Sequence, residues 1–262
     1  MPGPIITLTT DFGHRDHYVA AMKGVIVTLC PQALLIDISH EIRPQAVRQA
    51  GYLLASAARY FPPGTVHLAV VDPGVGTGRR PIAVGTARAI YVGPDNGLFS
   101  LVMGREPVQW AVHLTNPRYH LAEVSATFHG RDIFAPAAAH LACGADPHEM
   151  GESLPPASLL VTGSLQIYEE GAGPWEARVL HIDRFGNMIT DFQVSDPQSR
   201  LVVTVAGERI AQLRHTFADV EVGGLVAYVG SSGLLEIAVR QGSAAATLGS
   251  GLDSPVHIRE AA

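Results

Sequence analysis

The sequence contains little charge and no long run of lysine or arginine. Charged residues make up 16% of the 262 residues, and the formal net charge is −6. Because proteins that bind nucleic acid usually present a basic face, this composition argues against a nucleic-acid partner. The longest apolar runs have the length of a β-strand, well short of the roughly 20 residues that span a bilayer. We therefore expect no nucleic acid and no membrane among its partners.

Cysteine is scarce as well. The two cysteines, Cys30 and Cys143, lie far apart in the sequence, and neither belongs to a CxxC pair or a histidine-rich cluster. Isolated cysteines of this kind are typical of buried, inert thiols. The N-terminus shows no basic segment followed by an apolar one, so no secretory signal peptide is predicted. We expect a soluble, cytoplasmic protein.

Strand-like and helix-like segments alternate over residues 1–160. This alternation is typical of an α/β domain with a mostly parallel central sheet and helices on both of its faces. Apolar residues at helical spacing predict the helices, and short buried runs predict the strands. The predicted strands are Pro4–Thr9, Ala33–Ile38, Val66–Val71, Ile82–Val84, Ala89–Val92 and Gln109–Leu114, and the predicted helices are Asp16–Leu29, Gln45–Tyr60, Asn96–Met103 and Arg131–Ala142.

The second part of the chain has a different pattern. Glycine, proline and serine interrupt the stretch Gly151–Gly173, and we place a linker at residues 161–174. Short strand-like runs without a long helical stripe fill residues 175–262, which predicts a smaller all-β, barrel-like domain. The predicted strands are Ala177–Ile182, Leu201–Val205, Leu225–Val229, Leu234–Val239 and Val256–Ile258.

Three polar clusters follow predicted strands of the first domain. They are Thr9–Gly13 with Asp16 after it, Asp72–Arg80, and Gly93–Gly97. In open parallel sheets ligands bind at the carboxyl ends of strands, so three such clusters would meet at one edge. Each cluster taken alone is more typical of a turn, because aspartate, proline and glycine are the residues that turns need.

The glycine-rich stretch DPGVGTGRR has neither the GK[ST] ending of a phosphate-binding loop nor the spacing of a dinucleotide fingerprint. It offers a carboxylate at a strand end, Asp72, and a guanidinium seven positions later, Arg79. A flexible loop between them allows the two side chains to pair, which would keep the carboxylate ionised and oriented.

A fourth cluster, Phe128–Asp132, precedes the alanine-rich helix. His129 is a candidate acid or base, and the helix dipole next to it disfavours its protonated form. A histidine at this place is more often structural. The loops Asp183–Asn187, Thr216–Asp219 and Gly230–Gly233 of the second domain are further candidates that turn chemistry also explains.

A metal site is a further interpretation of the first cluster. Asp11, His14, Asp16 and His17 lie close together in sequence, but they match no metal-binding spacing. Capping of the following helix by Asp16 is the simpler explanation. We expect no metal.

Taken together, these motifs resemble one family. The runs ITLTTDFG, IDISH, FPPGTVHLAVVDPGVGTGRR, YVGPDNGLF and TFHGRDIFAPAAAHLA of the first domain are similar to those of the S-adenosylmethionine hydroxide adenosyltransferases. The runs HIDRFGNMITDF, HTFADV and YVGSSGLLEIAV of the second domain are similar as well. The resemblance extends over nearly the whole chain.

The resemblance implies an N-terminal α/β domain, a C-terminal β-barrel and a homotrimer that binds its substrate between subunits. The substrate would be S-adenosyl-L-methionine, hydrolysed to adenosine and L-methionine without a cofactor. The catalytic aspartate, arginine and histidine of the family fall on Asp72, Arg79 and His129. The positions that match substrate-binding residues are Asp11 for the ribose, Asp16, Asp183 and Ser231 for the methionine, and Asn187, Phe217 and the backbone at Val239 for the adenine.

Two alternatives remain open at this point. Related halogenating enzymes cleave the same substrate, but they lack the aspartate, arginine and histidine and carry an insertion where Thr86–Tyr91 runs on directly. Gly130 stands where the fluorinating enzymes offer a serine to the halide, and Asp72 would repel an anion. A non-catalytic sensor of adenosine or S-adenosylmethionine is the other alternative, although a sensor has no use for residues that activate water.

Overall fold

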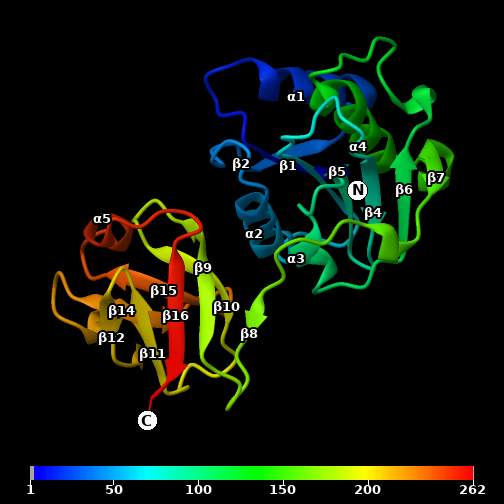
Figure 1. Ribbon diagram of the computed structural model, residues 1–262. Helices are drawn as coiled ribbons and strands as arrows, with labels where there is room; N and C mark the ends of the chain where they lie inside the picture. The colour runs from blue at the N-terminus through cyan, green and yellow to red at the C-terminus, as the bar shows by residue number, and fades with distance from the viewer. Residues whose placement is uncertain (1–2, 262) are drawn as a thin grey trace. The chain divides into compact units, whose positions relative to one another are not determined.

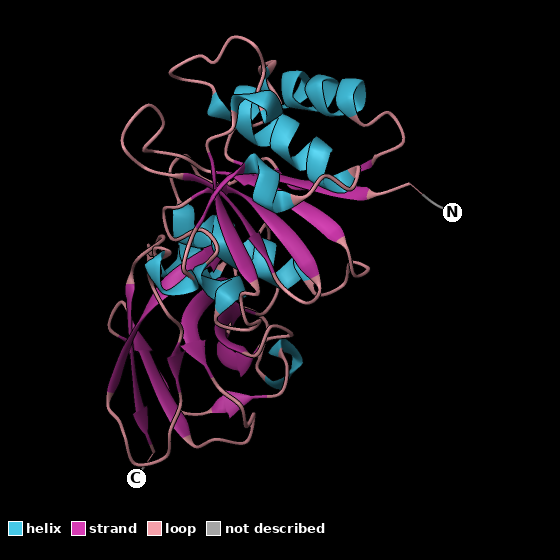
Figure 2. Cartoon of the chain, turned by 90° about the vertical axis from the view of Figure 1, so that its right-hand side faces the viewer, coloured by secondary structure: helices cyan, strands magenta, loops and turns pink. Residues whose placement is uncertain are grey.

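The computed structural model describes residues 3–261, which form two compact units (Figures 1 and 2). The first unit ends at Gly163 and the second begins at Ser164. Among the described residues, no helix has both the length and the apolar character needed to cross a membrane.

The first unit is built on a seven-stranded sheet in the order β2-β1-β3-β5-β4-β6-β7. Strands β2, β1, β3 and β5 pair in parallel, as predicted, but β4, β6 and β7 join through antiparallel pairings. The expected mostly parallel sheet is therefore a mixed one. The loop between β4 and β5 is too short for the crossover that parallel neighbours need. The strands are β1 Ile5–Thr10, β2 Leu34–Ser39, β3 Thr65–Val70, β4 Pro81–Gly85, β5 Ala89–Pro94, β6 Trp110–Leu114 and β7 Gly151–Ser153.

Helices cover both faces of this sheet, as Figure 2 shows. Side chains that alternate along β3 supply the two cores: Val66 and Leu68 lie in one buried cluster, whereas Ala69 and the following Val71 lie in the other. The first cluster includes residues of α1 and α4, and the second includes residues of α2 and α3. The helices are α1 Tyr18–Leu29, α2 Val47–Ala58, α3 Ser100–Met103 and α4 Ala135–Ala142.

A disulfide joins Cys30 to Cys143, and the expectation of two buried free thiols is wrong. Each cysteine ends a helix, Cys30 at α1 and Cys143 at α4, and the two helices pack against each other. Their Cα atoms lie 6.2 Å apart, within the range that a disulfide bridges. Cys30 is buried and Cys143 is exposed. A separation of 113 residues hides this proximity in the sequence.

Ordered elements lie in and before the expected linker, residues 161–174. Strand β7 extends the first sheet, and a 3-10 turn follows at Pro156–Ser158. Strand β8, Gln166–Ile167, pairs with β10 of the second unit.

The second unit is an all-β, nearly closed, barrel-like sheet in the order β12-β11-β16-β9-β10-β15-β14-β13, and β8 pairs with β10 off this path. Its core is a buried cluster that includes Val179, Phe192, Leu235 and Ile258. The short helix α5, Ala244–Leu248, is capped by the Ser243 side chain. The strands are β9 Trp175–Ile182, β10 Met188–Gln193, β11 Leu201–Val205, β12 Glu208–Ile210, β13 Leu213–Arg214, β14 Leu225–Val229, β15 Leu234–Val239 and β16 Pro255–Glu260.

Candidate active site

A cavity of about 420 Å³ lies at the carboxyl ends of β1 and β3 in the first unit. Asp11 directly follows β1, and Asp72 follows β3 after one further residue. Two of the three predicted polar clusters therefore meet there. The cavity is lined by Asp11, Phe12, Tyr18, Pro44, Gln45, Val70, Asp72, Pro73, Val75, Thr127, Phe128, His129 and Gly130.

The third cluster, Gly93–Gly97, hydrogen-bonds to neighbouring loops. Among the described residues, none of this cluster lines the cavity. Asp95 accepts a hydrogen bond of 2.9 Å from Arg80 Nε, and the Asn96 amide donates to the backbone oxygen of Val71 at 2.9 Å. Its role in this structure is that of a turn.

Asp72 and Arg79 form a forked ion pair. Arg79 Nε lies 2.9 Å from both carboxylate oxygens of Asp72, and Nη2 donates to Oδ2. The side chains are nearly buried, with exposed fractions of 6% for Asp72 and 9% for Arg79. Such two-point pairing fixes the carboxylate plane as well as its charge. The predicted pairing across the glycine-rich loop is present.

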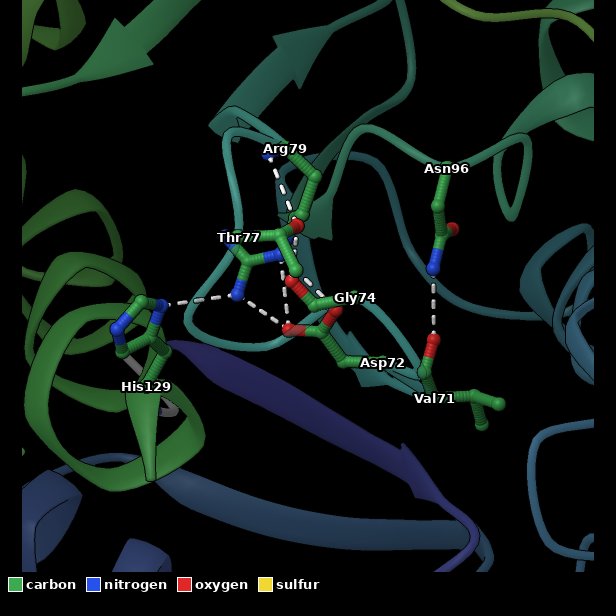
Figure 3. A network of polar contacts seen from close by, with 7 residues as sticks. All are labelled: Val71, Asp72, Gly74, Thr77, Arg79, Asn96 and His129. Carbon is green, nitrogen blue, oxygen red and sulfur yellow. Dashed lines mark hydrogen bonds and ion pairs between the residues drawn. The ribbon is translucent and has the colours of Figure 1, made fainter. Parts of the chain in front are cut away.

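The loop that joins this pair is held by its own hydrogen bonds, drawn in Figure 3. Thr77 Oγ1 donates to the backbone oxygen of Gly74 at 2.7 Å and accepts from the Arg79 amide at 3.4 Å. Gly76 has φ +76°, and a Cβ atom there would approach the backbone oxygen of Ala126 to 2.7 Å. The loop thus needs a glycine at this point to direct Arg79 back toward Asp72.

His129 completes the group, as Figure 3 shows. Its Nδ1 lies 3.0 Å from Arg79 Nη2. Because a guanidinium nitrogen only donates, Nδ1 accepts, and the proton of the neutral imidazole is on Nε2. Burial lowers the pKa of His129 below its usual 6.5, and the positive charge of Arg79 lowers it further against the opposing effects of Asp72 and Asp132. Burial and the Arg79 charge therefore disfavour protonated His129, the effect expected from the helix dipole.

His129 stands at the start of a π-helical turn, Gly130–Phe134, that leads into α4. The expected regular helix from Arg131 to Ala142 is therefore α-helical only from Ala135 onward. The amide of Ala135 donates to the backbone oxygen of Gly130, five residues back, which is the hydrogen bond of a π-turn.

Asp11 faces the same cavity. Its Oδ2 accepts a hydrogen bond of 2.8 Å from the Gln45 amide. Burial raises the pKa of Asp11 from 3.8, and the charge of Asp72 raises it further, while the backbone hydrogen bonds at Gln45 and Asp11 oppose the shift. Gln45 itself has φ +68°, which is uncommon for a residue with a side chain.

Three aromatic rings form the apolar wall of the cavity. The ring centroids are 5.7 Å apart for Phe12 and Tyr18, 6.0 Å for Phe12 and Phe128, and 5.2 Å for Tyr18 and Phe128. Gly130 completes this wall, where a Cβ atom would meet the Met22 sulfur at 3.3 Å. A larger side chain at Gly130 would therefore press on the core.

Asp16 is exposed and lines neither this cavity nor a neighbouring one of similar size among the described residues. The N-cap of α1 is His17, without a side-chain capping bond, so the expected capping by Asp16 is wrong. Within residues 3–261, no group of three or more histidine, cysteine, aspartate or glutamate side chains is placed to hold a metal ion.

The remaining predicted residues belong to the second unit. Asp183 Oδ1 accepts from the Phe185 and Asn187 amides at 2.9 Å each, and Oδ2 accepts from the Asn187 side-chain amide at 2.8 Å. Phe217 is 48% exposed and contacts Tyr228 edge-on at 5.6 Å. Ser231 is exposed, whereas Val239 is buried at the end of β15. Asp183 and Asn187 thus meet in one turn.

Sequence reasoning missed Gln45, Tyr18 and Phe134. Gln45 contributes only its amide to Asp11, which no side-chain motif reveals. Phe134 lies under the Arg79 guanidinium, with 5.0 Å between Cζ and the ring centroid. An aromatic residue within an alanine-rich helix was the only available signal for Phe134.

Comparison with known proteins defines the class. Residues 6–151 match the N-terminal domain of the SAM hydroxide adenosyltransferases, and residues 177–257 match the C-terminal domain. The chain belongs to this family.

Named relatives refine this result. An (R)-S-adenosyl-L-methionine hydrolase of Thermus thermophilus is 45% identical over 95% of this chain and 97% of its own. A hydrolase of the same name from Salinispora tropica is 44% identical over 95% of each chain. A fluorinase of Actinoplanes sp. is 28% identical over 90% of each. The crystal structure of an uncharacterized conserved protein from Thermotoga maritima, 36% identical, superposes with a TM-score of 0.86 over 97% of this chain and 99% of its own.

Proposed function

We propose that this chain hydrolyses S-adenosyl-L-methionine to adenosine and L-methionine. The observation that carries this proposal is the hydrogen-bonded group of Asp72, Arg79 and His129 beside a cavity that also holds Asp11. Membership of the hydroxide adenosyltransferase family and 45% identity with a hydrolase of this name support the choice of substrate.

The substrate is held at both ends and at the ribose. The ribose diol presents two donors, and the Asp11 carboxylate is the matching acceptor. The methionine ammonium requires acidic partners, which Asp16 and Asp183 supply, and the Ser231 hydroxyl binds the same end of the substrate. Asn187, Phe217 and the Val239 backbone hold the adenine. These assignments rest on the matching positions of the family motifs.

The reaction replaces the bond between C5′ and sulfur by a bond between C5′ and a water oxygen. The bonding electrons leave with sulfur, which departs as the neutral thioether of methionine and needs no acid. The His129 Nε2–H donates to the water oxygen and orients it, which is the kind of alignment worth up to roughly 7–11 kcal/mol.

The water proton goes to Asp72. Both imidazole nitrogens of His129 are already assigned, because Nδ1 accepts from Arg79 and Nε2 carries the proton. The proton becomes strongly acidic as the bond to C5′ forms, so a carboxylate is a sufficient base. Arg79 keeps that carboxylate oriented through its two-point contact.

We further propose a cytoplasmic homotrimer with active sites at subunit interfaces and no cofactor beyond the substrate. The support is the resemblance to the family, whose members assemble in this way.

Incubation of the purified protein with S-adenosyl-L-methionine, followed by chromatography, tests the hydrolysis. We expect adenosine and methionine in equal amounts, with ¹⁸O from labelled water in the 5′-hydroxyl. Adenosine at the uncatalysed rate would overturn the proposal in favour of a sensor.

The same incubation with chloride or fluoride separates the halogenating alternative. We expect no 5′-halo-adenosine, because Asp72 adds negative charge to the cavity wall and repels an anion there. A halogenated product would make the chain functionally similar to the fluorinase relatives.

A further inference from the structure

Of the three groups at the site, the Arg79 guanidinium is the one whose hydrogen bonds do not fully explain how it is held. It contacts Asp72 and His129, which both line the cavity. Arg79 itself is not among the described residues that line the cavity. It is nearly buried, and its Nη1 has no hydrogen-bond partner among the described residues. A buried cation with an unpartnered nitrogen needs a further source of stabilisation.

Phe134 supplies an aromatic face at this place. The Arg79 Cζ atom lies 5.0 Å from the centre of the Phe134 ring, within the range of a cation–π contact. Phe134 is fully buried in the core cluster between the sheet and helices α1 and α4, so its ring is held by packing on its other sides. A ring fixed in this way limits where the guanidinium can move.

The π-turn explains how one short segment contacts Arg79 twice. His129 and Phe134 are five residues apart, and in a regular α-helix their side chains would point about 140° apart. The wider π-turn at Gly130–Phe134 takes up one additional residue, which turns the two side chains toward the same side. Nδ1 of His129 contacts Nη2 of the guanidinium, and Cζ of the guanidinium lies over the Phe134 ring.

The turn is itself held in place by a buried carboxylate. Asp132, fully buried, accepts 2.5 Å and 2.8 Å hydrogen bonds from Arg131 Nε and from the Ser125 amide. Its backbone oxygen accepts from the Leu121 amide at 2.9 Å. The segment is therefore fixed independently of Arg79.

We infer that Phe134 is a positioning residue, which acts through Arg79 to hold Asp72 and His129 in their reactive arrangement. The expected effect of Phe134 on turnover rests on the proposed hydrolysis, whereas its effect on the position of Arg79 does not. The position of Arg79 also affects His129 directly, because the Arg79 charge lowers the pKa of His129. The other charged or titratable groups that act on or near His129 are Asp72, Asp132 and His120.

Phe134→Leu removes the aromatic face and keeps a buried apolar side chain. We expect kcat to fall about tenfold with KM changed less than about twofold, since the contact is of the size of a partly buried cation–π pair. By NMR, the titration midpoint of the His129 ring should move to higher pH, because Arg79 is no longer held beside it.

Phe99→Leu is the matched control. Phe99 is a buried aromatic residue of the same unit that contacts Tyr91 on the opposite face of the sheet. We expect a similar loss of thermal stability, but kcat and the His129 midpoint should remain those of the wild type. Phe134→Tyr, which restores the aromatic face, should recover kcat to within about threefold.

A folded Phe134→Leu protein with wild-type kcat and an unmoved His129 midpoint would overturn the inference, as would an equal loss of kcat in Phe99→Leu. Phe134→Met, whose longer and more flexible side chain adapts better to the space left by the ring, replaces the leucine variant if that variant does not melt cooperatively. The NMR titration needs no turnover. A wild-type protein that forms no adenosine would therefore contradict the proposed hydrolysis and still leave the positioning role measurable.

Discussion

The two units hold their candidate residues in different ways. In the first unit, Asp72 and Arg79 share one loop and His129 comes from another, and the three are joined to one another by hydrogen bonds, with Asp72 and Arg79 nearly buried. In the second unit, Asp183 and Asn187 are joined by hydrogen bonds within one turn, and Phe217 is half exposed. The first arrangement is fixed by its own hydrogen bonds, whereas the second leaves the Phe217 ring exposed.

This difference suggests a division of labour. A group that must align water needs fixed geometry, since misalignment by an ångström can cost two orders of magnitude in rate. Residues that only bind can sit on exposed loops. Substitutions of Asp72, Arg79 and His129 should therefore lower kcat, and those of the candidate residues in the second unit should raise KM.

The largest effect is expected for Asp72→Asn. The substitution keeps the size of the side chain but removes the charge that Arg79 pairs with and the acceptor for the water proton. We expect kcat to fall about 10³-fold, typical for loss of a general base, with substrate binding retained. Adenosine formation under saturating substrate measures kcat, and calorimetric titration measures binding.

Asp95→Asn is the control for this variant, because Asp95 forms a comparable ion pair with Arg80 in a neighbouring loop outside the cavity lining. We expect its kcat within about threefold of the wild type, as for other changes that do not touch reacting groups. Equal losses in the two variants would mean that the ion pairs matter for folding alone.

The sequence predicted most of the first unit because its strands are short apolar runs between turn residues. It missed β10 in the second unit, whose segment MITDFQ contains the charged Asp191. That carboxylate is buried, with 4% of its surface exposed, and accepts a 2.7 Å hydrogen bond from the Arg178 amide. In the sequence alone, a polar residue such as Asp191 is typical of the end of a strand, because its partner on the neighbouring strand is not visible.

The candidate site was predictable where its contacts are local. Asp72 and Arg79 share one loop, so seven residues of spacing were enough to suggest their pairing. Phe134 was not predictable, because a regular helix would direct it away from His129, and nothing in the sequence signals the π-turn. The Cys30–Cys143 disulfide was missed for a similar reason, since it depends on the packing of two helices.

The second largest effect concerns pH. Only neutral His129 can accept the hydrogen bond from Arg79, because a protonated imidazole has two donors. Burial and Arg79 hold the pKa of His129 below 6.5, so kcat/KM should be constant near neutral pH and should fall as pH drops through that lowered pKa. Rates measured between about pH 5 and about pH 9 give the profile, with falls of about tenfold per pH unit on the acidic side.

His129→Gln separates this titration from that of Asp11, whose carboxylate must be ionised and whose pKa is raised by burial. The variant should lose the part of the acidic fall that belongs to histidine and retain the part that belongs to Asp11. An unchanged profile in the variant would show that His129 does not titrate in the reaction.

A smaller effect is expected in the second unit, for Phe217→Ala. If the exposed ring stacks on the adenine, KM should rise about tenfold while kcat changes less than about twofold, since one base stacked on an aromatic side chain contributes roughly 1–3 kcal/mol. Val222→Ala, which shortens another exposed apolar side chain of this unit, should leave both constants unchanged. A fall in kcat for Phe217→Ala at unchanged KM would contradict the division of labour between the units.

The smallest effect on turnover is expected for Cys143→Ser, which removes the disulfide between the ends of α1 and α4. The bond joins the C-terminal ends of the two helices, whereas Tyr18 and His129 border the cavity at the opposite ends. We therefore expect kcat at about 25 °C to stay within about twofold of the wild-type value. The free energy of unfolding should fall by about 2–4 kcal/mol, because the bond closes a long loop in the unfolded chain. Thermal melts with and without a phosphine reductant measure this loss: the reductant should lower the Tm of the wild type to that of the variant and leave the variant unchanged. A reductant that lowers kcat of the folded wild type would show instead that the helix ends and the active site are coupled, and that the geometry of the first unit is not fixed by its local hydrogen bonds alone.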